Sequence, residues 1–241
     1  MISTAFHAGI YVPLYNGLVY LIDVIPAHDV GIAVILLTIA VRIILFPVSR
    51  AAVRTQKAMK EIGPQVEALK AKYKDKQEEQ AKAIFALYKE HNIRPFSSFF
   101  LVLLQLPILI GLYWVFYKGG LPMVHPESLY SFVKVPEAVN MKFLGFFDIG
   151  SRSVILAALA GVTQLIYARL SMGARKVALE SEASFSADMA KSFDLQARYM
   201  LPIMIAGIAY TVSAAVPLYW VTSNAFMIVQ ELLAGSRFKN Q

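Results

Sequence analysis

Long apolar runs recur along this chain and limit what it can fold into. The run VGIAVILLTIAVRIILF covers residues 30–46 with one charge, and the stretch 199–234 is predominantly apolar over 36 residues. A transmembrane helix needs about 20 mainly apolar residues to cross the hydrocarbon core. A membrane β-barrel would instead show short segments of alternating polarity. The runs therefore predict an α-helical membrane protein.

The composition supports this class. Hydrophobic residues make up 57% of the 241 residues and charged residues 16%, against about 45–50% and about 25% in ordinary soluble domains. Disorder needs low hydrophobicity and is excluded on the same ground. The chain has no cysteine, which excludes disulfides, thiolate metal sites, a cysteine nucleophile and a lipid-modified N-terminal cysteine.

The order of apolar and polar segments predicts five membrane spans. The last apolar stretch is too long for one span, so we place a tight turn at its midpoint, Pro217. Residues 1–29 are aromatic but interrupted by Pro13, Gly17 and Pro26. We expect them to form an interfacial amphipathic helix that does not span, with a disordered start as the alternative. The expected spans are about 30–47, 96–117, 147–170, 199–215 and 218–234.

A basic segment follows the first span. Residues 48–94 carry eleven Lys and Arg against six Asp and Glu, and their apolar positions recur every three or four residues. This pattern predicts an antiparallel helical hairpin that turns at residues 74–76. The polar segment 171–198 is balanced, with four basic and four acidic residues, and the tail adds Arg237 and Lys239, whereas residues before Arg42 carry no Lys or Arg. The positive-inside rule then places the N-terminus outside and the hairpin and C-terminus in the cytoplasm.

One charge interrupts the first span. Arg42 lies five residues before Pro47 in an otherwise apolar helix, where an arginine costs about 2.5–3.5 kcal/mol on insertion scales. It faces either a water-filled interior or the membrane surface, which a long side chain reaches by snorkelling. Thr38 shares its helix face because it is four residues away. Glu231, near the cytoplasmic end of the last span, is the one candidate carboxylate partner.

Other spans carry polar residues that could share an interior with Arg42. Each alone is typical of hydrogen bonding between helices, but together they indicate a wet interior. They are Gln105 in span two, Thr163 and Gln164 in span three, Thr211 and Ser213 in span four, and Ser223 and Asn224 in span five. The chain lacks the motifs of phosphate loops, zinc proteases, serine hydrolases and dinucleotide sites. We therefore expect no enzyme activity, cofactor, metal or nucleotide.

With these residues assembled, the chain resembles the YidC family of membrane protein insertases, which includes the mitochondrial oxidase-assembly and chloroplast Albino proteins. An arginine followed by proline five residues later leads into a basic hairpin, and QLPI and LYxxxSN spans follow. Four pieces carry the resemblance: TIAVRIILFPVSRAAVRTQKAMKEIGPQVEALKAKY at 38–73, ALYKEHNIRPFSSFFLVLLQLPILIGLYWV at 86–115, GVTQLIYARLS at 161–171 and PLYWVTSNAFMIVQELL at 217–233.

The resemblance implies an all-α domain, residues 30–241, with five transmembrane helices around a hydrophilic groove and a cytoplasmic hairpin at 48–94. Arg42 looks like the groove arginine of the family and Thr38 like its groove threonine. Gln164 resembles the polar groove residue of span three. Tyr219 and Trp220 match an aromatic pair that contacts substrate, and Leu106 and Leu109 match apolar substrate contacts.

We therefore expect a bacterial inner-membrane insertase and chaperone that moves small membrane proteins from the cytoplasm into the bilayer without nucleotide hydrolysis. Its expected partners are nascent membrane proteins and lipid, not DNA. A ribosome contact stays open because the tail is short, and whether the chain works beside a Sec-type translocon is open too. A small-anion transporter and a dry assembly scaffold are the alternatives. The basic hairpin either attracts anionic lipid and ribosomal RNA or is a solvated coiled coil.

Overall fold

The computed structural model describes residues 4–74, 76–93, 97–117, 119–172 and 195–237. Most of the polar segment 171–198 and the end of the tail lie outside these residues. The chain forms two compact units, Met1–Ile44 with Leu106–Gln241, and Leu45–Gln105.

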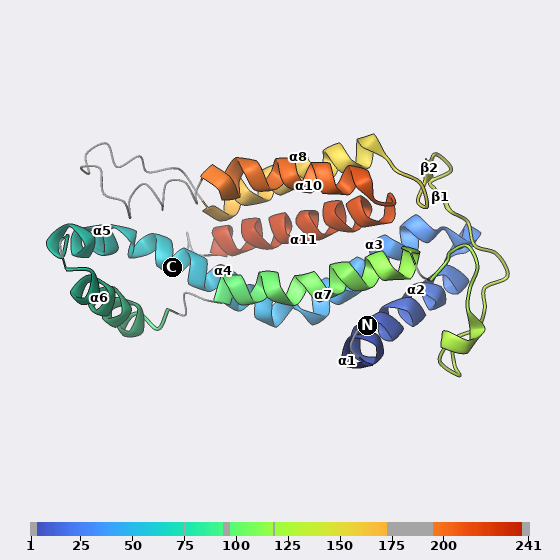
Figure 1. Ribbon diagram of the computed structural model, residues 1–241, viewed down its shortest axis with the longest axis horizontal. Coiled ribbons are helices and arrows are strands. Elements are labelled where there is room, and N and C mark those ends of the chain that lie inside the picture. Colours follow the sequence, from blue (N-terminus) through green and yellow to red (C-terminus); the bar gives the residue numbers. More distant parts are fainter. Residues whose placement is uncertain (1–3, 75, 94–96, 118, 173–194, 238–241) are drawn as a thin grey trace. The chain divides into compact units, whose positions relative to one another are not determined.

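The first unit is built from helices (Figure 1). The elements that lie in it wholly or in part are α1 (Thr4–Phe6), the π-helix η1 (His7–Tyr11), α2 (Val12–Val24), the 3-10 helix η2 (Pro26–His28), α3 (Val30–Ile44), α7 (Ser97–Tyr117), the 3-10 helix η3 (Pro126–Ser128), strands β1 (Lys142–Phe143) and β2 (Phe147–Asp148), α8 (Val154–Met172), the π-helix η4 (Gln196–Met200), α10 (Leu201–Thr211) and α11 (Ala215–Arg237).

Two helices in the described ranges are long and apolar enough to cross a membrane, Thr4–Val24 and Val154–Ser171. A third is added if the broken pair Val30–Ile44 and Phe46–Met59 counts as one span. The helical membrane class predicted from the apolar runs agrees with this structure. The N-terminal segment differs from the sequence expectation, since it forms one continuous helix of spanning length.

A π turn explains how this helix continues past Pro13. In η1 the N–H of Val12 bonds to the carbonyl of His7, five residues earlier. Proline lacks an N–H and its ring crowds the preceding turn, and a π turn directly before it gives the backbone one extra residue there. The same arrangement recurs before Pro202, where the N–H of Leu201 bonds to the carbonyl of Gln196.

Two helix boundaries differ from those expected from the sequence. Helix α8 begins at Val154 rather than near residue 147, because Phe147–Asp148 pairs antiparallel with Lys142–Phe143 as a short hairpin. Helix α10 ends at Thr211 and α11 begins at Ala215, so the turn precedes Pro217. Proline fits the first turn of a helix because the N–H there has no helical partner.

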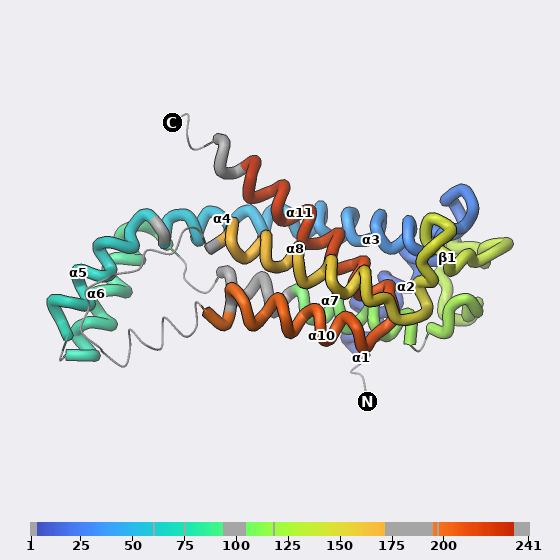
Figure 2. The backbone as a smooth tube through the Cα atoms, turned by 90° about the horizontal axis from the view of Figure 1, so that it is seen from above, coloured from blue at the N-terminus to red at the C-terminus, as the bar shows by residue number. Residues whose placement is uncertain are grey.

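Two apolar clusters hold the first unit together. The larger one joins α2, the start of α3, the end of α7 and the start of α11, with Tyr15, Leu18 and Ile22 fully buried at its centre. The smaller one joins α8, α10 and α11, which lie side by side in both views (Figures 1 and 2). Gly161 allows the close approach of α8 to α10, because a Cβ there would lie 2.9 Å from the Cβ of Ala206.

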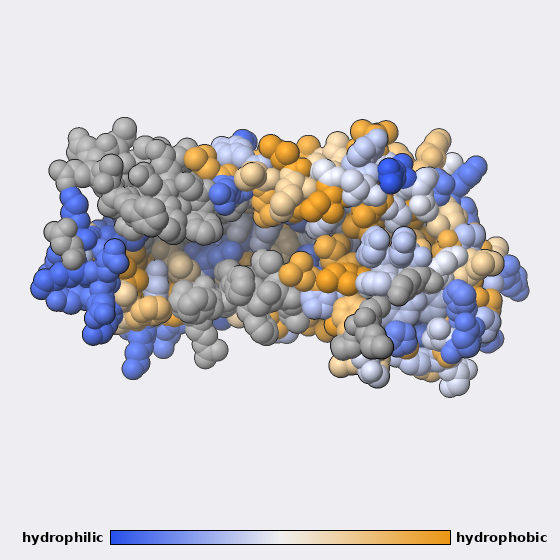
Figure 3. Space-filling view, in the orientation of Figure 1, coloured by the Kyte–Doolittle hydropathy of each residue, from blue (hydrophilic) through white to orange (hydrophobic). Residues whose placement is uncertain are grey.

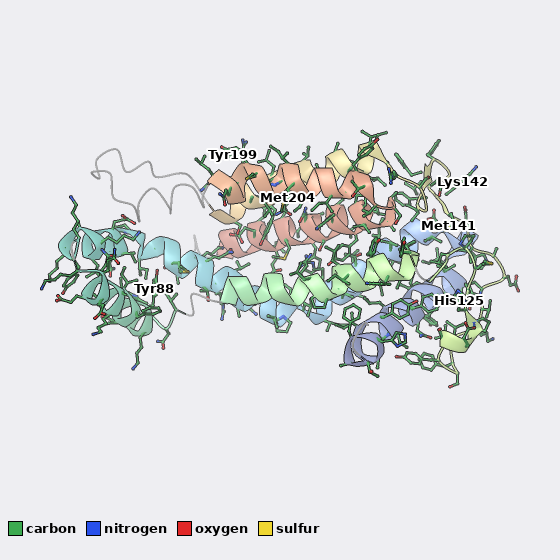
Figure 4. The ribbon with its side chains drawn as sticks, in the orientation of Figure 1. Tyr88, His125, Met141, Lys142, Tyr199 and Met204 are labelled. Carbon is green, nitrogen blue, oxygen red and sulfur yellow. The ribbon has the colours of Figure 1, made fainter. Side chains whose placement is uncertain are left out.

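Large apolar side chains also cover the outside of this unit. On α8 the exposed residues Ile155, Leu159, Val162 and Ile166 recur at helical spacing. Apolar surface gathers over α8 and α10 in the space-filling view (Figure 3), where Met204 of α10 is half exposed (Figure 4). Such a continuous apolar surface suits contact with lipid.

The second unit contains α4 (Phe46–Glu61), α5 (Gly63–Lys72) and α6 (Gln77–Glu90). Helices α5 and α6 pack against each other, and Ile62, Val66 and Ile93 form a small buried cluster. The turn expected at residues 74–76 falls between these two helices. The helix break at Ile62, before Pro64, was not expected from the periodic pattern.

Candidate functional site

One face of α3 is buried along its whole length, but its chemistry changes halfway. Val30, Val34, Thr38 and Arg42 follow one another at intervals of four residues, and none is more than 5% exposed. Residues four apart lie on the same side of a helix. The first two positions are apolar and the next two are polar. The buried face therefore leads from an apolar core into a polar cluster.

The side chain of Arg42 points toward α11. Its Nε donates a hydrogen bond to Ser223 Oγ at 2.7 Å, and its Nη2 donates to the same oxygen. Ser223 is fully buried and Arg42 is 5% exposed. The Arg42 side chain is therefore buried between α3 and α11; a water-filled surrounding stays a prediction.

The next residue of α11 reaches a different helix. Asn224 Nδ2 donates to Thr163 Oγ1 of α8 at 3.2 Å, and Thr163 Oγ1 donates to the carbonyl of Leu159 at 2.8 Å. Successive residues of a helix point about 100° apart, since 3.6 residues make a turn. The pair Ser223 and Asn224 therefore links α11 to α3 on one side and to α8 on the other.

Tyr167 of α8 belongs to the same region and was missed by the sequence reasoning. It is hydrogen-bonded to Ser171 and lies within electrostatic range of both Arg42 and Glu231. Glu231 is buried at 8% exposure, although its sequence position also allowed a surface location. The available signal was helical spacing, because Tyr167 follows Thr163 by four residues and therefore shares its face.

Thr38 and the aromatic pair also lie inside the first unit. The Thr38 hydroxyl donates to the carbonyl of Val34 at 2.6 Å, within its own helix. Tyr219 is 3% exposed, belongs to the larger apolar cluster and lies within electrostatic range of Arg42. Trp220 is 8% exposed and belongs to the smaller cluster. The two aromatic neighbours thus line different sides of α11.

The remaining expected residues are less enclosed. Gln164 is half-buried on α8, and Leu109 is half-buried against both apolar clusters. Leu106 is 45% exposed on α7. Gln105 is half-buried but belongs to the second unit, so it is not placed relative to Arg42.

The cluster has the chemistry of an anion site made of exchangeable hydrogen bonds. A guanidinium stays protonated and presents five N–H donors in a planar fork that matches carboxylates. The Ser223 hydroxyl that holds it can donate or accept, and the Thr38 hydroxyl and the Asn224 amide on the same two helices have the same capacity. Within the described ranges no group of three or more His, Asp or Glu side chains is placed to hold a metal ion.

Comparison with known proteins gives a consistent result. The family model described as 60Kd inner membrane protein matches residues 22–241. A protein of Clostridium tetani named membrane protein insertase YidC is 30% identical over 208 residues, which cover 86% of this chain and 82% of the relative. Membrane protein insertase MisCA of Bacillus subtilis is 29% identical over 215 residues, 87% of this chain and 71% of the relative.

A longer relative matches over a similar share of this chain. A YidC insertase of Methylobacillus flagellatus is 28% identical over 85% of this chain, which corresponds to 32% of its own length.

Proposed function

The chain belongs to the 60Kd inner membrane protein family and is similar to proteins named membrane protein insertase YidC, and we propose that it inserts small membrane proteins from the cytoplasm into the bilayer. It is an integral protein of a bacterial inner membrane, as the apolar helices and the bacterial relatives indicate. The names of the relatives support the insertase activity. The proposed mechanism of insertion rests on this chain's own residues.

We assign the five membrane helices to α3, α7, α8, the η4–α10 pair and α11. Their polar interior would form a hydrophilic groove, open to the cytoplasm and to lipid. The excess of basic residues in 48–94 over the N-terminal segment supports an outside N-terminus and a cytoplasmic α4–α6 region. In that orientation the polar half of α3 and α11 lies toward the cytoplasm and the apolar half toward the outside.

The buried Arg42 is the observation that carries the mechanism. It is 5% exposed and held by Ser223 inside apolar helices. A short polar segment of a nascent chain would enter the groove and exchange hydrogen bonds with this cluster. Because the guanidinium keeps its charge, it attracts acidic segments and lowers the cost of moving their carboxylates partway across.

The apolar helix of the substrate would then move into lipid beside α7 and α11. Leu106 is exposed on α7 at the expected contact position. Burial of apolar surface contributes about 25 cal/mol per Å². The membrane potential adds about 2.3 kcal/mol per 100 mV for each negative charge moved outward. These two sources suffice without nucleotide hydrolysis.

The basic α4–α6 region is the place for transient partners. Exposed lysines there, Lys76 among them, suit anionic lipid headgroups and ribosomal RNA, which attract positive charge at long range. A Sec-type translocon would share the lipid side of the groove.

Proteoliposomes with purified protein test the proposal. Wild type should insert single-span substrates with acidic and with neutral outer segments. Arg42→Ala should slow the acidic substrate by about tenfold or more, since a hydrogen bond to a charged group contributes about 1.5–3 kcal/mol. Arg42→Lys should retain most activity because it keeps the cation.

Two outcomes would contradict parts of this mechanism. Equal loss on acidic and neutral substrates would remove the charge-attraction role of Arg42. Absence of insertion by wild type, together with uptake of a small anion, would favour the transporter alternative, for which a buried cation is equally suited.

A further inference from the structure

A short hairpin between α7 and α8 exposes apolar side chains at its tip. Strands β1 and β2 are joined by Leu144, Gly145 and Phe146. Phe146 is 87% exposed, more than any other large apolar side chain in the described part of the chain, and Leu144 is 58% exposed. Leaving a phenyl and an isobutyl group in water forgoes their hydrophobic stabilisation. An exposed pair of this kind indicates a surface that something apolar covers.

The hairpin is fixed to the start of α3. Asp29 Oδ1 accepts hydrogen bonds from the N–H groups of Gly31 at 2.7 Å and Ile32 at 3.1 Å, which caps the helix. Its Oδ2 accepts from the N–H of Leu144 at 2.9 Å. Phe143 lies directly on Gly31, where a Cβ would come within 2.3 Å of the phenyl ring. The tip therefore has a defined position.

The other side of the hairpin is fixed to the start of α11. After β2, the N–H of Ile149 bonds to the carbonyl of Met141 at 2.8 Å. The carbonyls of Ile149 and Ser151 accept from Ala215 at 3.3 Å and Ala214 at 2.7 Å. Because both flanks are held, the tip cannot fold back to bury Phe146 without breaking these bonds.

The tip lies at the level where membrane helices begin. Helices α3, α8 and α11 all start at this end of the first unit (Figures 1 and 2), and Met141 and Lys142 lie there too (Figure 4). The exposed apolar face of α8 begins with Val154 at 65% and Ile155 at 59% exposure. The end of a spanning helix meets the headgroup region, where aromatic side chains are enriched.

We propose that the tip, Leu144–Phe146, is a membrane anchor that inserts into the interfacial region of the phospholipid bilayer. The exposed apolar face of α8, which begins with Val154 and Ile155, starts at the same end of the first unit as the hairpin, and this favours lipid over a protein partner. Lys142 and Arg152 flank the tip and are exposed, and such side chains extend their charged ends toward lipid phosphates. Through Asp29, Phe143 and Ala215, the anchor would hold the starts of α3 and α11 at one membrane depth.

Single-cysteine spin labels test this anchor, since the natural chain has no cysteine. Phe146→Cys is labelled with a nitroxide in full-length protein and reconstituted into phosphatidylethanolamine–phosphatidylglycerol liposomes. The readout is collision with oxygen, which concentrates in lipid, against collision with a water-soluble nickel chelate. Ile155→Cys on α8 serves as the lipid reference and Glu137→Cys, in the same loop, as the water reference.

A Phe146 label should give an oxygen-to-nickel ratio nearer that of Ile155→Cys. A ratio nearer that of Glu137→Cys overturns the proposal, because purified liposomes contain no protein to replace the lipid. Leu144→Cys provides a second tip position, which must give the same result. The measurement does not depend on insertion activity, so failure here leaves the insertase proposal standing.

Discussion

The two halves of the α3–α11 pair are equally buried but bury different chemistry. In the first half, Val30 and Val34 of α3 are fully buried and pack in the same cluster as Leu218 of α11. In the second half, Arg42 bonds to Ser223. Burial alone therefore does not make this interior apolar. One half is built to exclude water and the other to hold hydrogen-bonding groups.

This difference suggests how such a protein blocks the passage of polar groups across the membrane while it accepts polar segments of a substrate. Tyr15, Leu18 and Ile22 of α2 fill the apolar half with fully buried side chains. A close-packed apolar layer has no partners for a carboxylate or a peptide group. We infer that the apolar half is the barrier and the polar half the entry site.

The largest expected effect comes from placing a charge in the apolar half. Val34→Asp should lower the free energy of unfolding by about 3–5 kcal/mol, the range for an uncompensated buried charge. Thr38→Asp, one turn further, should be tolerated because it lies four residues from Arg42 and can pair with it. Thermal unfolding in detergent measures both. Equal destabilisation would mean that the two halves do not differ as described.

The next effect concerns the contact that holds Arg42. Ser223→Ala should cost about 1.5–3 kcal/mol, because it removes one acceptor of a charged donor. Thr222→Val is the matched control, since its hydroxyl donates to the carbonyl of Leu218 in its own helix, and it should cost less than about 0.5 kcal/mol. A Ser223→Ala protein as stable as wild type would show that the guanidinium is satisfied elsewhere.

A smaller effect is expected where helices pack without polar groups. Gly161→Ala should cost about 1–3 kcal/mol through overpacking against Ala206. Gly207→Ala on α10 has no atom within 4 Å of the added Cβ, so it should stabilise the helix by about 0.5–1 kcal/mol. The unfolding midpoints of the two variants measure these effects. Midpoints that change in the same direction in both variants would contradict the close α8–α10 approach.

The smallest effect is the bond between α11 and α8. A double-mutant cycle with Asn224→Ala and Thr163→Val should give a coupling of about 0.6 kcal/mol, the average for hydrogen bonds between membrane helices. A coupling near zero would indicate that the 3.2 Å contact between these side chains contributes nothing to the free energy of unfolding.

Sequence patterns predicted the features that depend on local spacing. The four-residue interval put Thr38 and Arg42 on one face, and both are buried. Polar residues of the last span, Ser223 and Asn224 among them, were assigned to an interior face, and their hydrogen bonds now identify the neighbouring helices. The groove itself stays a prediction, since it concerns water and substrate.

Features that depend on packing between distant segments were not predictable. Helical spacing could have put Tyr167 on the face of Thr163, but its interaction with Arg42 and Glu231 depends on how α8 packs against α11. The β1–β2 hairpin has two-residue strands, too short for an alternating pattern. The N-terminal segment was expected to form an interfacial helix too interrupted to span, but a π turn carries one helix of spanning length past Pro13.

Two positions on α8 give the most direct test of a hydrated polar interior. Gln164 is half-buried, whereas Ile166 is 44% exposed on the outer surface. A charged, water-soluble maleimide reacts with a thiolate, which forms in water, so its rate with Gln164→Cys and Ile166→Cys in liposomes reports hydration at each site. Gln164→Cys should react faster, although Ile166 is the more exposed residue, because lipid covers Ile166. Equal rates, or faster reaction at Ile166→Cys, would contradict a wet interior.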